Sequence, residues 1–232
     1  MRTNLPLLTR VAEQLRPLLD ELVFVGGATT ELFYSSRAAA RVRLTRDADV
    51  ICEVTGRVAY HRLGERLRKL GFNEDMTPGA PLCRWRSGTD ILDVMPTDES
   101  ILGFGNAWYG YGIRTAGSRE IAPGLRIQLL TPPVFIATKL DAYEGRGGGD
   151  LRGSHDIEDV VSVIAFRPEI VDELQTEDES LRDWVATRIR EHLLRHPDAE
   201  DALAANLPYA RILPALIPET RARLRAMASV EG

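Results

Sequence analysis

The spacing of apolar and polar positions changes character near residue 131. Before that point, short apolar runs typical of strands alternate with segments whose apolar residues recur every three to four positions, which predicts helices. The predicted strands are residues 22–25, 47–54, 82–85, 91–95, 120–121 and 125–130. The predicted helices are residues 5–21, which Pro17 breaks or kinks, 28–36 and 58–70.

After Thr131-Pro132-Pro133 the pattern is helical throughout. Proline suits the first turn of a helix, and helical spacing follows at 134–143, 157–166, 181–194 and 212–227. The pattern therefore predicts an α+β protein: a mixed β-sheet flanked by helices in a domain of residues 1–131, then a helical C-terminal domain of residues 132–232.

Two local features interrupt this pattern. Residues 87–90, Ser-Gly-Thr-Asp, are a hairpin signal between the third and fourth predicted strands. Residues 97–118 contain Trp108, Tyr109 and Tyr111 among several glycines and are predicted as an aromatic, loop-rich insertion. These rings suit stacking on a base or an acceptor, although aromatic clusters are more often packing.

Composition excludes several classes of protein. The chain has 232 residues and a net charge of −5, which argues against bulk electrostatic capture of nucleic acid. No apolar run reaches the ~20 residues that span a bilayer, and the charged N-terminal segment does not fit a signal peptide. Two cysteines in apolar surroundings, Cys52 and Cys83, are expected to be reduced core thiols, so we expect a cytoplasmic protein without a membrane partner.

Three aspartates carry the chemical signal. Asp47 and Asp49 are two apart on a predicted strand, so their side chains point to the same face. Burying two like charges is costly unless a cation joins them, and Mg²⁺ (or Mn²⁺) prefers such oxygen ligands. Asp93, a single charge in the apolar strand 91–95, is the third candidate ligand. The alternatives are a solvated strand edge for the first two and a salt bridge to an arginine for Asp93, with Asp90 in the hairpin as its competitor.

Gly26-Gly27 forms a turn between a predicted strand and a predicted helix. Backbone N–H groups at such a turn, with the helix N-terminus behind them, can hold a phosphate, and the hydroxyls of Thr29 and Thr30 are candidate donors. The glycine pair alone is a weak signal, because such turns occur in many unrelated proteins.

Together these features resemble the nucleotidyltransferase superfamily related to DNA polymerase β. The resemblance rests on Gly26-Gly27, on Arg43-x-Thr45-x-Asp47-x-Asp49 and on Leu92-Asp93-Val94. A second block resembles the AbiEii-type nucleotidyltransferases, some of which are toxins of toxin–antitoxin systems. It consists of Ala137-Thr138-Lys139-Leu140-Asp141-Ala142, then Arg146, then Asp156-Ile157-Glu158-Asp159-Val160.

The resemblance implies metal-dependent transfer of a nucleoside monophosphate from a nucleoside triphosphate to an acceptor. Asp47 and Asp49 would bind the metal, and Asp93 would be a ligand or a base. The nucleotide would be held by Gly26, Gly27, Thr29, Arg43, Thr45 and Lys139, with Asp156 or Asp159 orienting Lys139, Arg146 or the nucleotide.

Each of these assignments has a structural alternative. Arg43 and Thr45 suit shaping of the strand entry, Lys139 suits snorkelling at the surface, and Asp156 suits helix capping. His155 is expected to be a surface histidine. Two departures weaken the match: Ala28 stands where these families usually have serine, and residues 145–149, Gly-Arg-Gly-Gly-Gly, are unusually rich in glycine.

The acceptor stays open. It is a tRNA, a protein hydroxyl or a small molecule of the aminoglycoside type, and an antitoxin protein is a possible partner. A tRNA acceptor predicts a basic face beside the acids, for which the candidates are Arg37, Arg41, Arg43, Arg46, Arg84 and Arg86. The competing hypotheses are a nucleotide-binding regulatory module without catalysis and a metal-dependent phosphohydrolase; the sequence lacks the histidine-aspartate clusters typical of the latter.

Overall fold

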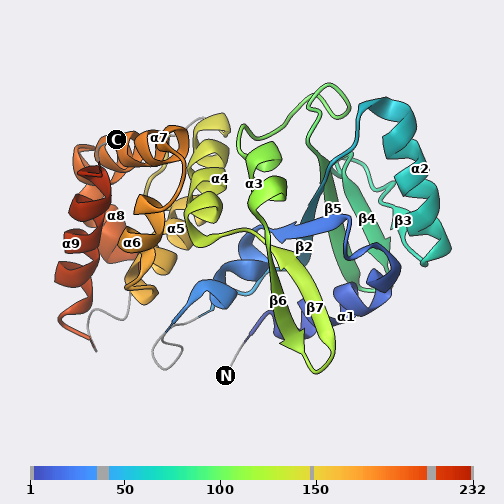
Figure 1. The fold of residues 1–232 in the computed structure, drawn as a ribbon, viewed down its shortest axis with the longest axis horizontal. Coiled ribbons are helices and arrows are strands. Elements are labelled where there is room, and N and C mark those ends of the chain that lie inside the picture. Colours follow the sequence, from blue (N-terminus) through green and yellow to red (C-terminus); the bar gives the residue numbers. More distant parts are fainter. Residues whose placement is uncertain (1–2, 36–41, 147–148, 208–212, 231–232) are drawn as a thin grey trace. The chain divides into compact units, whose positions relative to one another are not determined.

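The computed structural model describes residues 3–35, 42–146, 149–207 and 213–230 (Figure 1). The chain divides into two compact units. The first comprises Met1–Thr29 and Val42–Thr131, and the second comprises Thr30–Arg41 and Pro132–Gly232. Arg37, Arg41, Gly147 and Gly148, which entered the sequence predictions, lie outside the described residues.

The first unit is built on a seven-stranded sheet in the order β3-β4-β5-β2-β1-β7-β6. The β1–β7 and β2–β5 pairs are parallel, and the others are antiparallel. The mixed sheet of the predicted α+β fold is thereby confirmed. Its strands are β1 Leu22–Val25, β2 Asp47–Cys52, β3 Asn73–Glu74, β4 Arg84–Ser87, β5 Asp90–Pro96, β6 Gly117–Ala122 and β7 Leu125–Leu129.

The helices of this unit are shorter or differently placed than the periodicity indicates. The predicted helix 5–21 ends early: α1 is Leu5–Gln14, and a separate 3₁₀ turn, η1 (Arg16–Leu18), contains Pro17, which lacks an N–H to continue the α-helix. α2 is Gly56–Lys69; its Gly64 lets it approach the ring of Trp85, because a Cβ there would lie 3.0 Å from the indole.

Two further sequence predictions are corrected. Residues 28–36 were expected to form an α-helix, but Gly27–Phe33 is a 3₁₀ helix, η2. Residues 97–118 were expected to be loop-rich, but they contain the helix α3, Tyr109–Thr115, in which Tyr109 donates a hydrogen bond to the sulfur of Met95 on β5. The expected hairpin at 87–90 is confirmed, because Ser87 pairs with Asp90.

The second unit is helical, as predicted. Its elements are α4 Pro132–Gly145, α5 His155–Phe166, α6 Ile170–Gln175, α7 Glu179–Arg188, the π-helix η3 Ile189–Leu194, α8 Ala199–Asn206 and α9 Leu216–Ala228. The segment 181–194, expected to be one helix, is split between α7 and η3. Buried residues lie on every side of α4, which makes it the central helix of this unit.

The longest helices of the described residues, α2 and α4, have 14 residues each. No described helix is long and apolar enough to cross a membrane. Cys52 and Cys83 are buried and free of disulfide bonds, as expected.

Candidate functional site

Four residues form a row across the middle of the first unit's sheet. Arg84 on β4 lies opposite Asp93 on β5, Asp93 lies opposite Asp49 on β2, and Asp49 lies opposite Val25, the last residue of β1. The sheet thus brings Asp49 and Asp93 onto neighbouring strands in register.

The three aspartates differ in their exposure to solvent. The Asp93 side chain is 10 % exposed and that of Asp47 is 32 % exposed, while Asp49 has intermediate burial. Asp47 and Asp49 face the same side of β2, and the buried Ala48 between them faces the other side. The site therefore opens to solvent on the side of Asp47, and its deepest carboxylate is Asp93.

Arg84 is the direct partner of Asp93. Its Nε donates to Oδ1 of Asp93 over 2.8 Å, and its Nη2 donates to Oδ2 over 2.7 Å. The same Nη2 lies 3.1 Å from Oδ2 of Asp47. The hydrogen bonds to Asp93 raise the pKa of Arg84 above its usual value. The salt bridge to an arginine, which was the alternative for Asp93, is therefore present.

Arg84 was named only as part of a basic face, yet the sequence contained the signal for its position. A hairpin that pairs Ser87 with Asp90 also pairs Arg86 with Ile91 and Arg84 with Asp93. The two-residue turn at Gly88-Thr89 fixes this register, and Gly88 has the φ of +58° that such turns demand. Counting back from the hairpin therefore places an arginine beside the third carboxylate.

Gly26 is in direct contact with the site. Its φ is +73°, which a residue with a side chain rarely adopts, and a Cβ there would lie 1.9 Å from Oδ2 of Asp49. Both the backbone conformation and the available space therefore require glycine. The turn and the carboxylate approach one another more closely than the sequence alone indicated.

Gly27 lies against Arg43. A Cβ at Gly27 would meet Nη2 of Arg43 at 2.3 Å and Cγ2 of Thr45 at 3.1 Å, so the positive guanidinium rests on the backbone of the glycine turn. This is the position that a nucleotide-binding role for Arg43 requires. Thr45 instead donates its hydroxyl to the backbone carbonyl of Asp47, which fits the alternative that it shapes the strand entry.

Asn4 holds the segment that carries Arg43 and Thr45, and sequence reasoning missed it. Its Nδ2 donates to the carbonyl oxygen of Arg43 over 2.9 Å, and its Oδ1 accepts from the N–H of Thr45 over 3.1 Å. Asn4 is 3 % exposed. It comes directly before α1 and nothing in its sequence neighbourhood distinguishes it from an ordinary residue at the start of a helix.

The expected hydroxyl donor is not available for a phosphate. Thr29 is fully buried, and its hydroxyl donates to the carbonyl oxygen of Gly26 over 2.8 Å. In addition, the helix that follows the turn is η2, a short 3₁₀ helix of seven residues, instead of a long α-helix. The turn therefore offers backbone N–H groups and Arg43, rather than Thr29 and a long helix dipole.

The second sequence block forms a buried charge cluster within the second unit. Nζ of Lys139 lies 2.7 Å from Oδ2 of Asp159 and 3.2 Å from Oδ1 of Asp156, and Arg146 also pairs with Asp156. Lys139, Asp156 and Asp159 are each less than 10 % exposed. Lys139 therefore does not snorkel at the surface, and Asp156 is not the helix cap, because Ser154 accepts from the N–H of Ile157.

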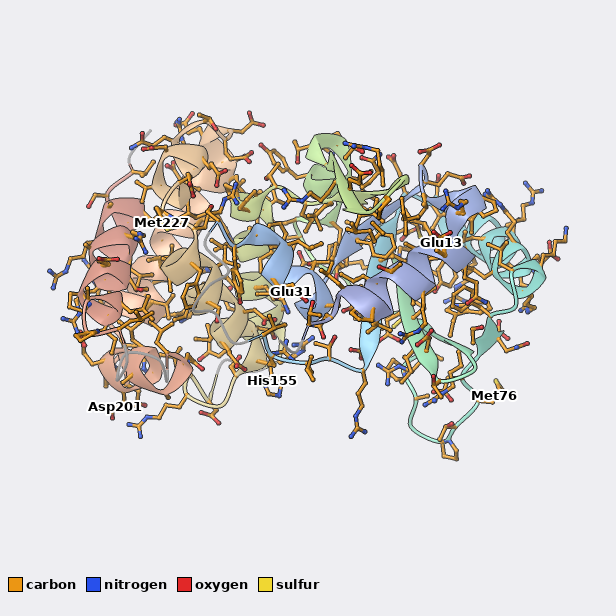
Figure 2. The ribbon with its side chains drawn as sticks, turned by 90° about the horizontal axis from the view of Figure 1, so that it is seen from below. Glu13, Glu31, Met76, His155, Asp201 and Met227 are labelled. Carbon is orange, nitrogen blue, oxygen red and sulfur yellow. The ribbon has the colours of Figure 1, made fainter. Side chains whose placement is uncertain are left out.

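A hollow of about 270 Å³ lies beside this cluster in the second unit. It is lined by Tyr143, Arg146, Gly149, Asp150, Gly153, Ser154, His155 and Asp156. His155 is exposed at the start of α5, as expected, and projects from the surface (Figure 2). Gly149 and Asp156 thus line the same hollow.

The basic face predicted beside the acids is only partly present. Arg84 is paired with the aspartates, Arg86 is paired with Asp75, and Arg46 is exposed. The competitor Asp90 is held by Arg10 and belongs to that pair instead. Trp108 and Tyr111 pack edge to face at 6.0 Å, which is a packing arrangement.

A different basic surface lies on α2, and sequence reasoning passed over it. This helix has five cationic residues and one carboxylate, Glu65; the cations are Arg57, Arg62, Arg66, Arg68 and Lys69. Arg66 and Arg68 are paired with Glu21 and Glu74. Arg57, Arg62 and Lys69 are exposed and make no side-chain ion pair within the described residues.

The carboxylate oxygens of Asp47 and Asp49 suit Mg²⁺ or Mn²⁺, and Asp49 lies beside the glycine turn. Among the described residues, one trio of acidic or histidine side chains brings its ligand atoms within 4.8 Å of one another: Glu144, Glu191 and His192. That trio shares Glu144 with Arg188 and is a salt-bridge network. The ligand atoms of the three aspartates do not all come within that distance of one another.

No protein-family model matches this sequence, and a search of the curated proteins finds no significant match.

Proposed function

We propose that this protein is a metal-dependent nucleotidyltransferase that transfers a nucleoside monophosphate from a nucleoside triphosphate to an acceptor. The observation that carries the proposal is the packing of the Gly26 backbone against the carboxylate of Asp49, which itself lies opposite Asp93. The glycine turn and a pair of carboxylates then share one location in one unit.

The residues divide the work by their chemistry. Asp47 and Asp49 would hold a divalent cation, which supplies activation of the attacking oxygen and stabilisation of the leaving pyrophosphate. The N–H groups of the Gly26-Gly27 turn would donate to the triphosphate. Arg43, whose guanidinium rests on Gly27, adds a planar pair of donors that suits a phosphate.

Asp93 would be the third acid, and both of its oxygens accept hydrogen bonds from Arg84. A role as a base or ligand requires that Arg84 release at least one of them. Lys139 and Arg146 balance the charges of Asp156 and Asp159 within the second unit, so we assign them a structural role there and leave them out of the transfer step.

For the acceptor, the exposed cations of α2 favour a nucleic acid such as a tRNA over an aminoglycoside. Arg57, Arg62 and Lys69 are not neutralised by described side chains, and phosphodiester backbones bind such clusters. A protein acceptor and the toxin role, with an antitoxin as partner, stay within the same proposal. We expect the reaction in the cytoplasm, where nucleoside triphosphates are available and buried thiols stay reduced.

The test is incubation of the full chain with Mg²⁺, each radiolabelled nucleoside triphosphate, and a pool of tRNA, protein and aminoglycosides. Label should move to one acceptor class, and Asp47→Ala and Asp49→Ala should lose this transfer. Asp90→Ala is the matched control, because Asp90 lies on β5 but pairs with Arg10. Absence of transfer to every acceptor, together with no thermal shift from Mg²⁺ and nucleotide, would overturn the proposal.

A further inference from the structure

Arg84 binds two of the three candidate metal ligands. It donates to both oxygens of Asp93 and to Oδ2 of Asp47. The Arg84 side chain is 22 % exposed and Asp93 is 10 % exposed, so this contact is partly shielded from water. A positive charge already lies where the proposed function requires a divalent cation.

The guanidinium cannot yield this place by losing a proton, because arginine stays charged at any pH a protein tolerates. It can only move. A divalent cation that binds Asp93 or Oδ2 of Asp47 therefore competes with the three hydrogen bonds for the carboxylate charge, and it repels the guanidinium at short range.

Once displaced, Arg84 needs another anion, since an unpaired charge in a partly buried position is unfavourable. A triphosphate supplies one, and the planar guanidinium matches a phosphate with two parallel hydrogen bonds, as it matches Asp93 here. Arg84 is on the same sheet row as Asp49, which contacts the glycine turn.

We propose that Arg84 is a place-holder for the divalent cation: it neutralises Asp93 and Asp47 in the metal-free protein and exchanges them for a phosphate when cation and triphosphate bind together. The inference rests on the proposed function and adds a coupling to it. The cation alone binds weakly because it must break the Arg84 contacts, whereas the cation–triphosphate complex gives Arg84 a new partner.

The experiment measures two affinities of the full-length chain by electron paramagnetic resonance of Mn²⁺. One is the affinity for Mn²⁺ alone, and the other is the affinity for the preformed complex of Mn²⁺ with inorganic triphosphate. In Arg84→Met, we expect Mn²⁺ alone to bind about tenfold more tightly than in the wild type and the complex to bind about tenfold more weakly. Changes of the two affinities in opposite directions distinguish the exchange from damage to the site.

Arg86→Met is the matched control. Arg86 is two residues along β4, faces the same side and pairs with an acid outside the row, Asp75. Both affinities should equal those of the wild type. Arg84→Lys keeps the charge but loses the bidentate geometry, so it should change both affinities in the same directions by a smaller factor, and it serves if Arg84→Met does not fold.

Two outcomes overturn the place-holder role. If Arg84→Met weakens both affinities, Arg84 positions the carboxylates instead; if it behaves as Arg86→Met does, Arg84 has no role in cation binding. The proposed function fails separately, when the wild type binds neither Mn²⁺ nor the complex, or when Asp49→Asn binds both as well as the wild type does.

Discussion

A Cβ atom at Gly26 would lie 1.9 Å from Oδ2 of Asp49 and 2.8 Å from its Cβ, so the glycine turn and the strand carboxylate are in direct contact. Rotating the Asp49 side chain would relieve the first clash but not the second. The strand that carries the acid and the turn that would seat the phosphate are thus coupled through one position, where any side chain would move the backbone.

This contact predicts the effect of Gly26→Ala. The φ of +73° costs about 1–2 kcal/mol with alanine, and the clash with Asp49 adds to this cost and displaces the carboxylate. We expect lower stability in urea unfolding and loss of Mn²⁺ binding by paramagnetic resonance. The control is Gly124→Ala, because Gly124 has a φ of +70° and open space around its Cβ position. If Gly124→Ala costs as much stability as Gly26→Ala, the Asp49 contact is unimportant.

The strands that carry the candidate site followed from the sequence, but their order in the sheet did not. Apolar runs and the glycine turn mark β1, β2 and β5 locally. The β1–β7 pair joins residues about a hundred positions apart, such as Val23 with Gln128, and no local pattern encodes that pairing. The Asp49–Asp93 register likewise depends on a parallel pair whose two strands are joined by a long connection.

Burial could not be assigned from the sequence where opposite charges meet. The alternative for Lys139, snorkelling at the surface, is wrong, because a lone lysine on an apolar helix does not by itself reveal the carboxylates that reach it from another helix. Asp156 and Asp159 come from α5 and enclose it. The repulsion expected between Asp47 and Asp49 left out a nearby cation for the same reason, because Arg84 on β4 pairs with Asp47.

The Lys139 cluster predicts a large loss of stability on removal of the lysine. Lys139→Met leaves Asp156 and Asp159 buried without the ammonium that pairs with both, so the free energy of unfolding should fall by about 3–5 kcal/mol. Adding Asp159→Asn should restore part of it, because the uncompensated charge is then removed. Urea unfolding of the two variants measures both. A double variant no more stable than Lys139→Met would contradict the charge balance.

The cations of α2 predict a salt-dependent interaction with nucleic acid. Replacing Arg57, Arg62 and Lys69 with glutamine should weaken binding of a tRNA pool and reduce the slope of log affinity against log salt by about 2 to 3. The control replaces three other exposed arginines, Arg119, Arg195 and Arg225, and changes net charge equally. Equal losses in both triple variants would mean that net charge, not the α2 surface, determines binding.

The buried thiols predict a dependence on alkaline pH. Burial raises the pKa of Cys52 and Cys83 to about 12 each, from a usual value of 9.0, and the carboxylate of Asp93 adds to the effect on Cys83. The folded protein therefore keeps both thiols protonated where the unfolded chain ionises. The stability that this provides is complete below pH 9 and is lost as the pH rises from about 9 to 12.

Two measurements check this dependence on pH. Ellman's reagent at pH 8 should react with neither cysteine until urea unfolds the chain. The urea midpoint of the wild type should also fall between pH 9 and 11 more steeply than that of Cys52→Ala/Cys83→Ala. Rapid labelling of the native protein, or identical slopes for the two proteins, would contradict the burial of these thiols.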